Sequence, residues 1–128
     1  MREVIEPALD CGKIVICDRF LDSSIAYQAY GRELGEDFIR QINAKTLERV
    51  RPDRTILLTV DLAVSRKRMS QGAPLDRLEL EKDDFFRRVQ AGYTKLTQAE
   101  PDRVAVVDAS RSIEEVFESV KTAVEEVL

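Results

Sequence analysis

The chain has 128 residues, of which 44% are hydrophobic and 34% are charged, and this composition predicts one soluble α/β domain with a single core. Its net charge is −4, and its basic residues are interleaved with acidic ones, which argues against nonspecific nucleic-acid binding. The chain contains no histidine, so histidine-based acid–base catalysis and most zinc sites are excluded.

Short apolar runs at 14–17, 55–60 and 104–107 have the length and composition of buried parallel strands. Gly12-Lys13 has no glycine five residues earlier and is followed by Ile14 in place of Ser or Thr, so it does not match a phosphate-binding loop. We expect it to form the turn into the first of these strands. Helical segments are predicted between and after these strands. The apolar positions that indicate the first helix recur at three- and four-residue steps before Pro52: Phe38, Ile39, Ile42, Thr46 and Val50.

Three further helices follow in the predicted order. A short one is expected over 63–71, and a longer one over 81–99. One face of this longer helix carries Phe86, Val89, Tyr93 and Leu96, and packing against the core explains this stripe. Ser112 and Glu115 have the S-x-x-E spacing of a capping box, which predicts that an amphipathic terminal helix begins there and runs to Val127.

Cys11 and Cys17 are too far apart for a C-x-x-C motif and lie among apolar residues, so we expect both to be reduced core residues of a cytoplasmic protein. The longest apolar runs have the length of strands, and Met1 is followed by charged residues. We therefore expect neither a membrane span nor a signal peptide.

Asp18 and Arg19 follow directly after the first predicted strand. The carboxyl ends of parallel strands open onto the ligand crevice of an α/β fold, so these two side chains are placed to reach a bound ligand. Arginine offers a fork of donors that suits phosphate oxygens, and the carboxylate is suited to a magnesium-bound water or a sugar hydroxyl. The alternative is a structural ion pair at the end of a strand.

A basic stretch runs from Arg66 to Arg77 and is interrupted by Gly72 and Pro74, which predicts a mobile loop. The alternative is a solvated basic turn balanced by the acidic residues that follow it: Glu79, Glu81, Asp83 and Asp84.

Several short strings in chain order together resemble thymidylate kinases over essentially the whole chain. They are Asp18-Arg19-Phe20, Ser23-Ser24, Ala26-Tyr27-Gln28, Gly31-Arg32, Arg51-Pro52-Asp53, Asp61, Arg66 to Arg68, Leu75-Asp76-Arg77, Tyr93 and Val107-Asp108-Ala109-Ser110. The resemblance implies an α/β fold of the P-loop NTPase kind, a three-layer parallel sheet with flanking helices, lacking its first strands. No G-x-x-x-x-G-K-[ST] run is present in the chain, and the family's stretch that stacks on the thymine base is also missing.

The resemblance further implies transfer of the ATP γ-phosphate to dTMP with Mg²⁺, with dTMP and ATP as partners and a homodimer as a possible assembly. It implies that Arg19 holds the acceptor phosphate and that Asp18 organises a magnesium-bound water or the sugar. It also implies that the basic stretch is similar to the family's lid, in which Arg68 and Arg77 serve the transferring phosphoryl group, because phosphoryl transfer depends on cations that close over the transferring oxygens and exclude water. The remaining implied residues line the nucleoside pocket (Phe20, Ser24, Tyr27 and Gln28) or the ATP site (Arg66, Ser110 and Arg111). Tyr27 and Gln28 are equally explained as a half-buried helix face, and Ser110 and Arg111 as an ordinary strand-to-helix corner.

Three alternatives remain open at this point: a deoxynucleoside kinase relative, a non-catalytic remnant that binds nucleotides or a partner, and an incomplete gene product. Because no phosphate cradle is visible, we expect this polypeptide alone to be inactive. In the family a central strand separates the strand at 14–17 from the strand at 55–60. Without it, we expect 14–17 to pair directly with 55–60, to self-associate, or to remain partly unfolded.

Overall fold

The computed structural model describes residues 3–47, 50–61, 63–65, 68 and 77–128, and side chains at 45–47 and 77–82 are not described. The described residues form two compact units. The first draws on Met1–Arg51 and Asp83–Thr94, and the second on Pro52–Lys82 and Lys95–Leu128. The long helix α5 (Arg77–Ala99) contributes residues to both. Whether the chain is a single domain, as its length suggests, stays a prediction.

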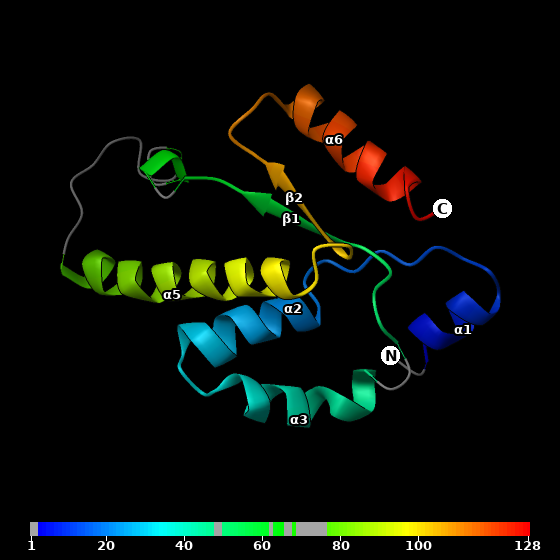
Figure 1. The fold of residues 1–128 in the computed structure, drawn as a ribbon, viewed down its shortest axis with the longest axis horizontal. Helices are drawn as coiled ribbons and strands as arrows, with labels where there is room; N and C mark the ends of the chain where they lie inside the picture. The colour runs from blue at the N-terminus through cyan, green and yellow to red at the C-terminus, as the bar shows by residue number, and fades with distance from the viewer. Residues whose placement is uncertain (1–2, 48–49, 62, 66–67, 69–76) are drawn as a thin grey trace. The chain divides into compact units, whose positions relative to one another are not determined.

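The first unit is helical (Figure 1). Its elements are α1 (Ile5–Asp10), α2 (Leu21–Ser24), η1 (Ile25–Gly31), α3 (Glu36–Leu47) and the middle of α5. The small residues of η1 allow close packing against neighbouring helices, since Ala26 and Ala29 are buried beside the fully buried Ile25. The rest of this core consists of Leu21, Ile39 and Val89.

Two glycines set the approach of η1 to α5 within the first unit. A Cβ atom on Gly31 would lie 2.7 Å from a Phe85 ring carbon, and one on Gly92 would lie 2.8 Å from the Tyr30 ring. The Gly31 carbonyl also accepts a hydrogen bond of 3.1 Å from Arg88 Nε. The middle of α5 therefore lies directly against η1, and any larger residue at these two positions must displace an aromatic ring.

The second unit is built on a two-stranded parallel sheet, with β1 (Thr55–Thr59) beside β2 (Val104–Asp108) and α6 (Ile113–Glu125) packed on β2 (Figure 1). The register pairs Thr55 with Val104 and Thr59 with Asp108. Arg103 supports the start of the sheet, since its Nη1 donates to the Thr55 hydroxyl over 2.6 Å. The predicted strands at 55–60 and 104–107, and the α/β class with a parallel sheet, are confirmed.

The predicted strand at 14–17 is wrong. Residues 13–17 have no regular secondary structure, and within the described residues β1 pairs only with β2. Ile14 is 68% exposed and Ile16 is 92% exposed. An apolar run becomes a buried strand only where another strand satisfies its backbone groups, and the described residues provide none for this run. Direct pairing of 14–17 with 55–60 is therefore not observed.

The expectation that both cysteines belong to the core is also wrong. Cys11 is the C-cap residue that follows α1, Cys17 lies in the segment at 13–17, and both are exposed. The apolar neighbours that suggested burial, Ile14 and Ile16, are themselves exposed, so apolar sequence context did not report packing here. The turn predicted at Gly12 is confirmed, with a φ of 69° in the left-handed region.

Two of the predicted helices are present with shifted ends. The first is α3, which ends at Leu47. Of the stripe residues on α3 whose side chains are described, Ile39 is buried, whereas Phe38 and Ile42 are 52% and 61% exposed. The long helix α5 begins at Arg77 rather than at 81, and Phe86 on its predicted core face is exposed. Residues 63–65 and 68 are helical, and the rest of the helix predicted over 63–71 lies outside the described residues.

The terminal helix α6 begins at the predicted capping box. The Ser112 hydroxyl accepts from the Glu115 amide, and the Glu115 carboxylate accepts from the Ser112 amide. Among the described helices, none is both long enough and apolar enough to cross a membrane.

Candidate functional site

The turn before α2 carries the Asp-Arg pair that the sequence singled out. Arg19 has a φ of 64°, in the left-handed region that L-residues other than glycine rarely occupy. Such a conformation costs about 1 to 2 kcal/mol, so it persists only where surrounding contacts hold it. Asp18 and Arg19 are both exposed and form no ion pair with each other, so the structural alternative of a strand-end ion pair is not what the structure shows.

The guanidinium of Arg19 lies over the ring of Tyr27, with its central carbon 4.3 Å from the ring centroid. Tyr27 is in turn held by an aromatic cluster, which we define as Tyr27, Phe85 and Tyr93. The ring centroids of Phe85 and Tyr93 are 6.0 Å and 6.5 Å from that of Tyr27, both edge to face. The Tyr93 hydroxyl shares a hydrogen bond of 3.0 Å with the Ser23 hydroxyl.

Tyr27 and the half-buried Gln28 lie on η1, which is a π-helix. Its wide turns are visible in the hydrogen bond from the Arg32 amide to the Tyr27 carbonyl, which spans five residues. A π-turn rotates the following side chains relative to a regular α-helix, and such turns occur often at functional sites.

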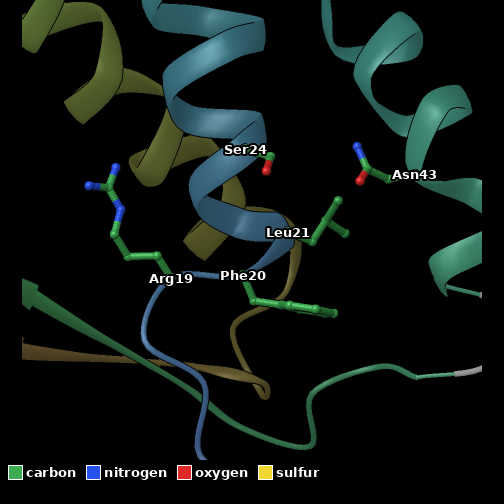
Figure 2. A pocket seen from close by; sticks show the side chains of 5 residues that line it. All are labelled: Arg19, Phe20, Leu21, Ser24 and Asn43. Carbon is green, nitrogen blue, oxygen red and sulfur yellow. The ribbon is translucent and has the colours of Figure 1, made fainter. Parts of the chain in front are cut away.

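An open pocket of about 200 Å³ lies beside the same turn, lined by Arg19, Phe20, Leu21, Ser24 and Asn43. Figure 2 shows that the Arg19 guanidinium points away from Asn43. The backbone and stem of Arg19 therefore border this pocket, while its charged end lies over Tyr27.

Asn43 was not predicted as a site residue. Its side-chain amide donates to the Ile39 carbonyl over 2.8 Å, which leaves the carboxamide oxygen available as an acceptor at the pocket. The available signal was a polar residue inside the apolar pattern of α3, next to Ile42. Phe85 was missed as well, because its partner Tyr27 is distant in sequence and only tertiary packing brings them together.

Magnesium ions usually keep several waters and take one or two carboxylates together with substrate phosphates. Within the described residues no group of three metal-ligating side chains is present, so a dedicated all-protein cage is not found there. Asp18 is a single exposed carboxylate next to Arg19. It therefore fits contact with Mg²⁺ through a water molecule and does not fit the role of a principal magnesium ligand.

The residues expected on the ATP side belong to the second unit. The Asp108 carboxylate accepts from the Ser110 amide over 2.9 Å, and the hydrogen bonds from Ser110 hold the pKa of Asp108 below its ordinary value. Arg111 Nε lies 3.6 Å from Asp108, and Arg68 Nη1 donates to the Ala109 carbonyl over 3.1 Å. The loop between β2 and α6 thus contains Ser110 and Arg111, and Arg68 contacts it at Ala109.

The side chains of two predicted site residues, Arg66 and Arg77, are not described by the structure. Arg66 lies outside the described residues, as does most of the basic stretch from Arg66 to Arg77. Arg77 is the first residue of α5, and its side chain is not described. The structure therefore brings together Arg19, Phe20, Ser24 and Tyr27 in the first unit, and Arg68, Ser110 and Arg111 in the second.

Known proteins match this chain almost from end to end. The thymidylate kinase family model matches residues 1–120. The thymidylate kinase of Symbiobacterium thermophilum is 47% identical over 124 residues, which cover 97% of this chain and 58% of that protein. The thymidylate kinase of Exiguobacterium sibiricum is 45% identical, over 89% of this chain and 54% of that protein.

A crystal structure of thymidylate kinase from Ehrlichia chaffeensis is similar with a TM-score of 0.72 and 28% identity. The match covers 97% of this chain and 56% of that one. The chain thus spans a little over half the length of the curated relatives and the solved structure that it matches.

Proposed function

This chain belongs to the thymidylate kinase family, and we propose that it supplies the acceptor side of a dTMP kinase, which transfers the γ-phosphate of ATP to dTMP and yields dTDP. In that reaction a phosphate oxygen of dTMP forms a bond to the γ-phosphorus as the bond to the ADP oxygen breaks. Catalysis of this kind depends on positioning and on cations around the transferring group rather than on covalent chemistry.

The observation that carries the proposal is the exposed Arg19 guanidinium at the turn before α2, whose central carbon lies over the Tyr27 ring at 4.3 Å from its centroid. A stacked guanidinium keeps its in-plane N–H donors available, and these match two phosphate oxygens at once. In the proposal Arg19 holds the dTMP phosphate, and Phe20, Ser24, Tyr27 and Gln28 line the nucleoside pocket, with Tyr27 at the sugar edge.

The donor side of the proposal involves the second unit. Arg66 packs against the adenine together with the loop at Ser110 and Arg111, while Arg68 and Arg77 balance the charge of the transferring phosphoryl group. Asp18 would hold a magnesium-bound water or the sugar, and Mg²⁺, when bound, would supply positive charge beside the donor phosphates. For Arg68, action on the phosphoryl group requires release of its present hydrogen bond to Ala109.

Binding of dTMP compared with thymidine tests the acceptor site, with titration calorimetry as the measurement. One charge-assisted contact contributes about 1.5 to 3 kcal/mol, so dTMP should bind about ten- to a hundredfold more tightly than thymidine. Arg19→Ala should remove most of this preference, whereas Arg87→Ala, which removes an exposed arginine of α5, should leave it unchanged. The preference should also shrink with added salt.

Equal affinity of the parent chain for dTMP and thymidine would contradict the proposal. So would a preference that Arg19→Ala leaves intact, because the phosphate contact would then lie elsewhere.

The 128-residue polypeptide by itself is expected to show negligible turnover of dTMP with ATP. The reason is that the sequence contains no G-x-x-x-x-G-K-[ST] run to cradle the donor phosphates. A coupled assay of ADP release measures this. Turnover at rates ordinary for kinases, lost in Arg19→Ala, would show that another segment of this chain cradles the donor phosphates.

A further inference from the structure

We propose that Tyr27 is a positioning residue for Arg19: its ring holds the guanidinium in the orientation that receives the acceptor phosphate before any ligand binds. This inference rests on the proposed function of Arg19 as the phosphate contact. It adds to the sugar-edge role of Tyr27 a second one, exerted through Arg19 and not through direct contact with the phosphate.

The geometry of the contact is that of a cation on an aromatic face. The guanidinium carbon lies 4.3 Å from the Tyr27 ring centroid, well within the range of about 6 Å in which the ring attracts a cation. A cation–π contact of this kind leaves the N–H donors at the edge of the guanidinium without a carboxylate partner. An ion pair with a carboxylate would instead occupy that edge, and Asp18 and Arg19 form no such pair with each other.

The ring that holds Arg19 is itself fixed. Tyr27 is half-buried, and the edge-to-face contacts with Phe85 and Tyr93 have interplanar angles of 66° and 82°. The hydrogen bond between Tyr93 and Ser23 ties this aromatic cluster to α2, the helix that begins just after the Arg19 turn. The ring therefore provides a rigid surface for a side chain that otherwise has many rotamers.

The backbone conformation of Arg19 is a second observation that supports a preorganised guanidinium. The φ of 64° is unfavourable for an arginine, yet it belongs to the conformation in which the side chain reaches the Tyr27 ring. A conformation that costs free energy locally and directs a charged side chain onto a fixed ring is the arrangement expected of a preorganised ligand contact.

A measurement without ligand tests the stacking itself. The side-chain protons of Arg19 should show an upfield ring-current shift in NMR spectra of the parent chain. Tyr27→Phe should keep the shift because it keeps the ring, and Tyr27→Leu should abolish it. Absence of the shift in the parent, or its persistence in Tyr27→Leu, would overturn the inference whatever the ligand affinities are.

The functional readout is the ratio of dTMP affinity to thymidine affinity, measured by calorimetry. Loss of a sugar contact changes both affinities equally and leaves the ratio unchanged, so the ratio isolates the phosphate contact. Tyr27→Leu should lower it by about two- to thirtyfold, the range of a cation–π contact, and Tyr27→Phe should stay within about twofold of the parent.

Three outcomes would overturn the inference: an unchanged ratio in Tyr27→Leu, a ratio lowered as much in Tyr27→Phe as in Tyr27→Leu, or a parent chain without any preference for dTMP. The last outcome also removes the proposed function, whereas the first two leave it standing. If Tyr27→Leu does not fold, Tyr27→Met takes its place, since the unbranched side chain fills the same space without a ring.

Discussion

Replacement of Gly31 by alanine tests whether the close approach of η1 to α5 is as tight as the structure shows. The added Cβ would lie 2.7 Å from Phe85 Cε2 and 2.8 Å from Val89 Cγ2, and contacts below 3.0 Å require something to move. Overpacking of this kind costs about 1 to 3 kcal/mol. Alanine recovers about 0.4 to 1 kcal/mol by restricting the unfolded chain, so a net loss of about 1 to 2 kcal/mol is expected.

Urea unfolding measures this loss as a lower midpoint with an unchanged slope. A double-mutant cycle with Phe85→Leu identifies the cause, because the smaller side chain should relieve the clash by about 1 kcal/mol relative to additivity. Gly35→Ala is the matched control. Its Cβ would meet no atom within 4 Å, and its cost arises from a φ of 87° alone, so it should be additive with Phe85→Leu.

The reasoning about this contact would be refuted if Gly31→Ala were as stable as the parent, or if it were additive with Phe85→Leu. Either result would mean that the two helices have room to separate. In that case Phe85 would not hold the Tyr27 ring in the orientation described above.

The remaining predictions concern two hydrogen-bonded carboxylates and their partners. Ser112→Ala should cost about 0.5 to 2 kcal/mol of unfolding free energy in urea titrations, because it removes the N-cap of α6; a loss no larger than that of Ser119→Ala on the same helix would contradict this. The hydrogen bond from the Ser112 amide lowers the pKa of Glu115. The stability that this hydrogen bond contributes is therefore present above the ordinary pKa of glutamate and is lost as the pH falls through the pKa of the folded state. Glu115→Gln should flatten the decrease of the unfolding free energy at acidic pH. The hydrogen bond to Glu36 raises the pKa of Tyr30. The stability that this hydrogen bond contributes is therefore present below the ordinary tyrosine pKa and is lost as the pH rises through the pKa of the folded state. If the unfolding free energy of Tyr30→Phe fell with alkaline pH as steeply as that of the parent, this hydrogen bond would not be formed in solution.

Elements set by local rules were predictable from the sequence. The start of α6 followed from the spacing of Ser112 and Glu115, because both partners of a capping box lie within one turn. The strands β1 and β2 were predictable from apolar runs. The run at 14–17 shows the limit of that signal, since Ile14 and Ile16 have the same pattern and yet form no strand. Whether an apolar run pairs depends on a neighbour that its own residues do not specify.

Some residues of the candidate site were singled out from the sequence, whereas Asn43, Phe85 and the contacts between the residues were not. The Asp-Arg string and Tyr27 were singled out from the sequence, and the structure places Arg19 and Tyr27 against each other. The left-handed φ of Arg19 had no sequence signal, because only glycine or asparagine would have suggested it. The π-turns of η1 and the contact of Phe85 with Tyr27 depend on tertiary packing, which periodicity cannot report.

The parallel pairing of β1 with β2 has a consequence for the order in which the chain folds. The Thr59 hydroxyl and the Val107 carbonyl that it meets are 48 residues apart in sequence, and closing a loop of this length costs about 3 kcal/mol of chain entropy. Contacts of α6 are local by comparison, and its capped first turn can form before any sheet exists. The sheet should therefore be consolidated late, with folding-rate effects that are small for substitutions in β1 and larger for those in the early helices.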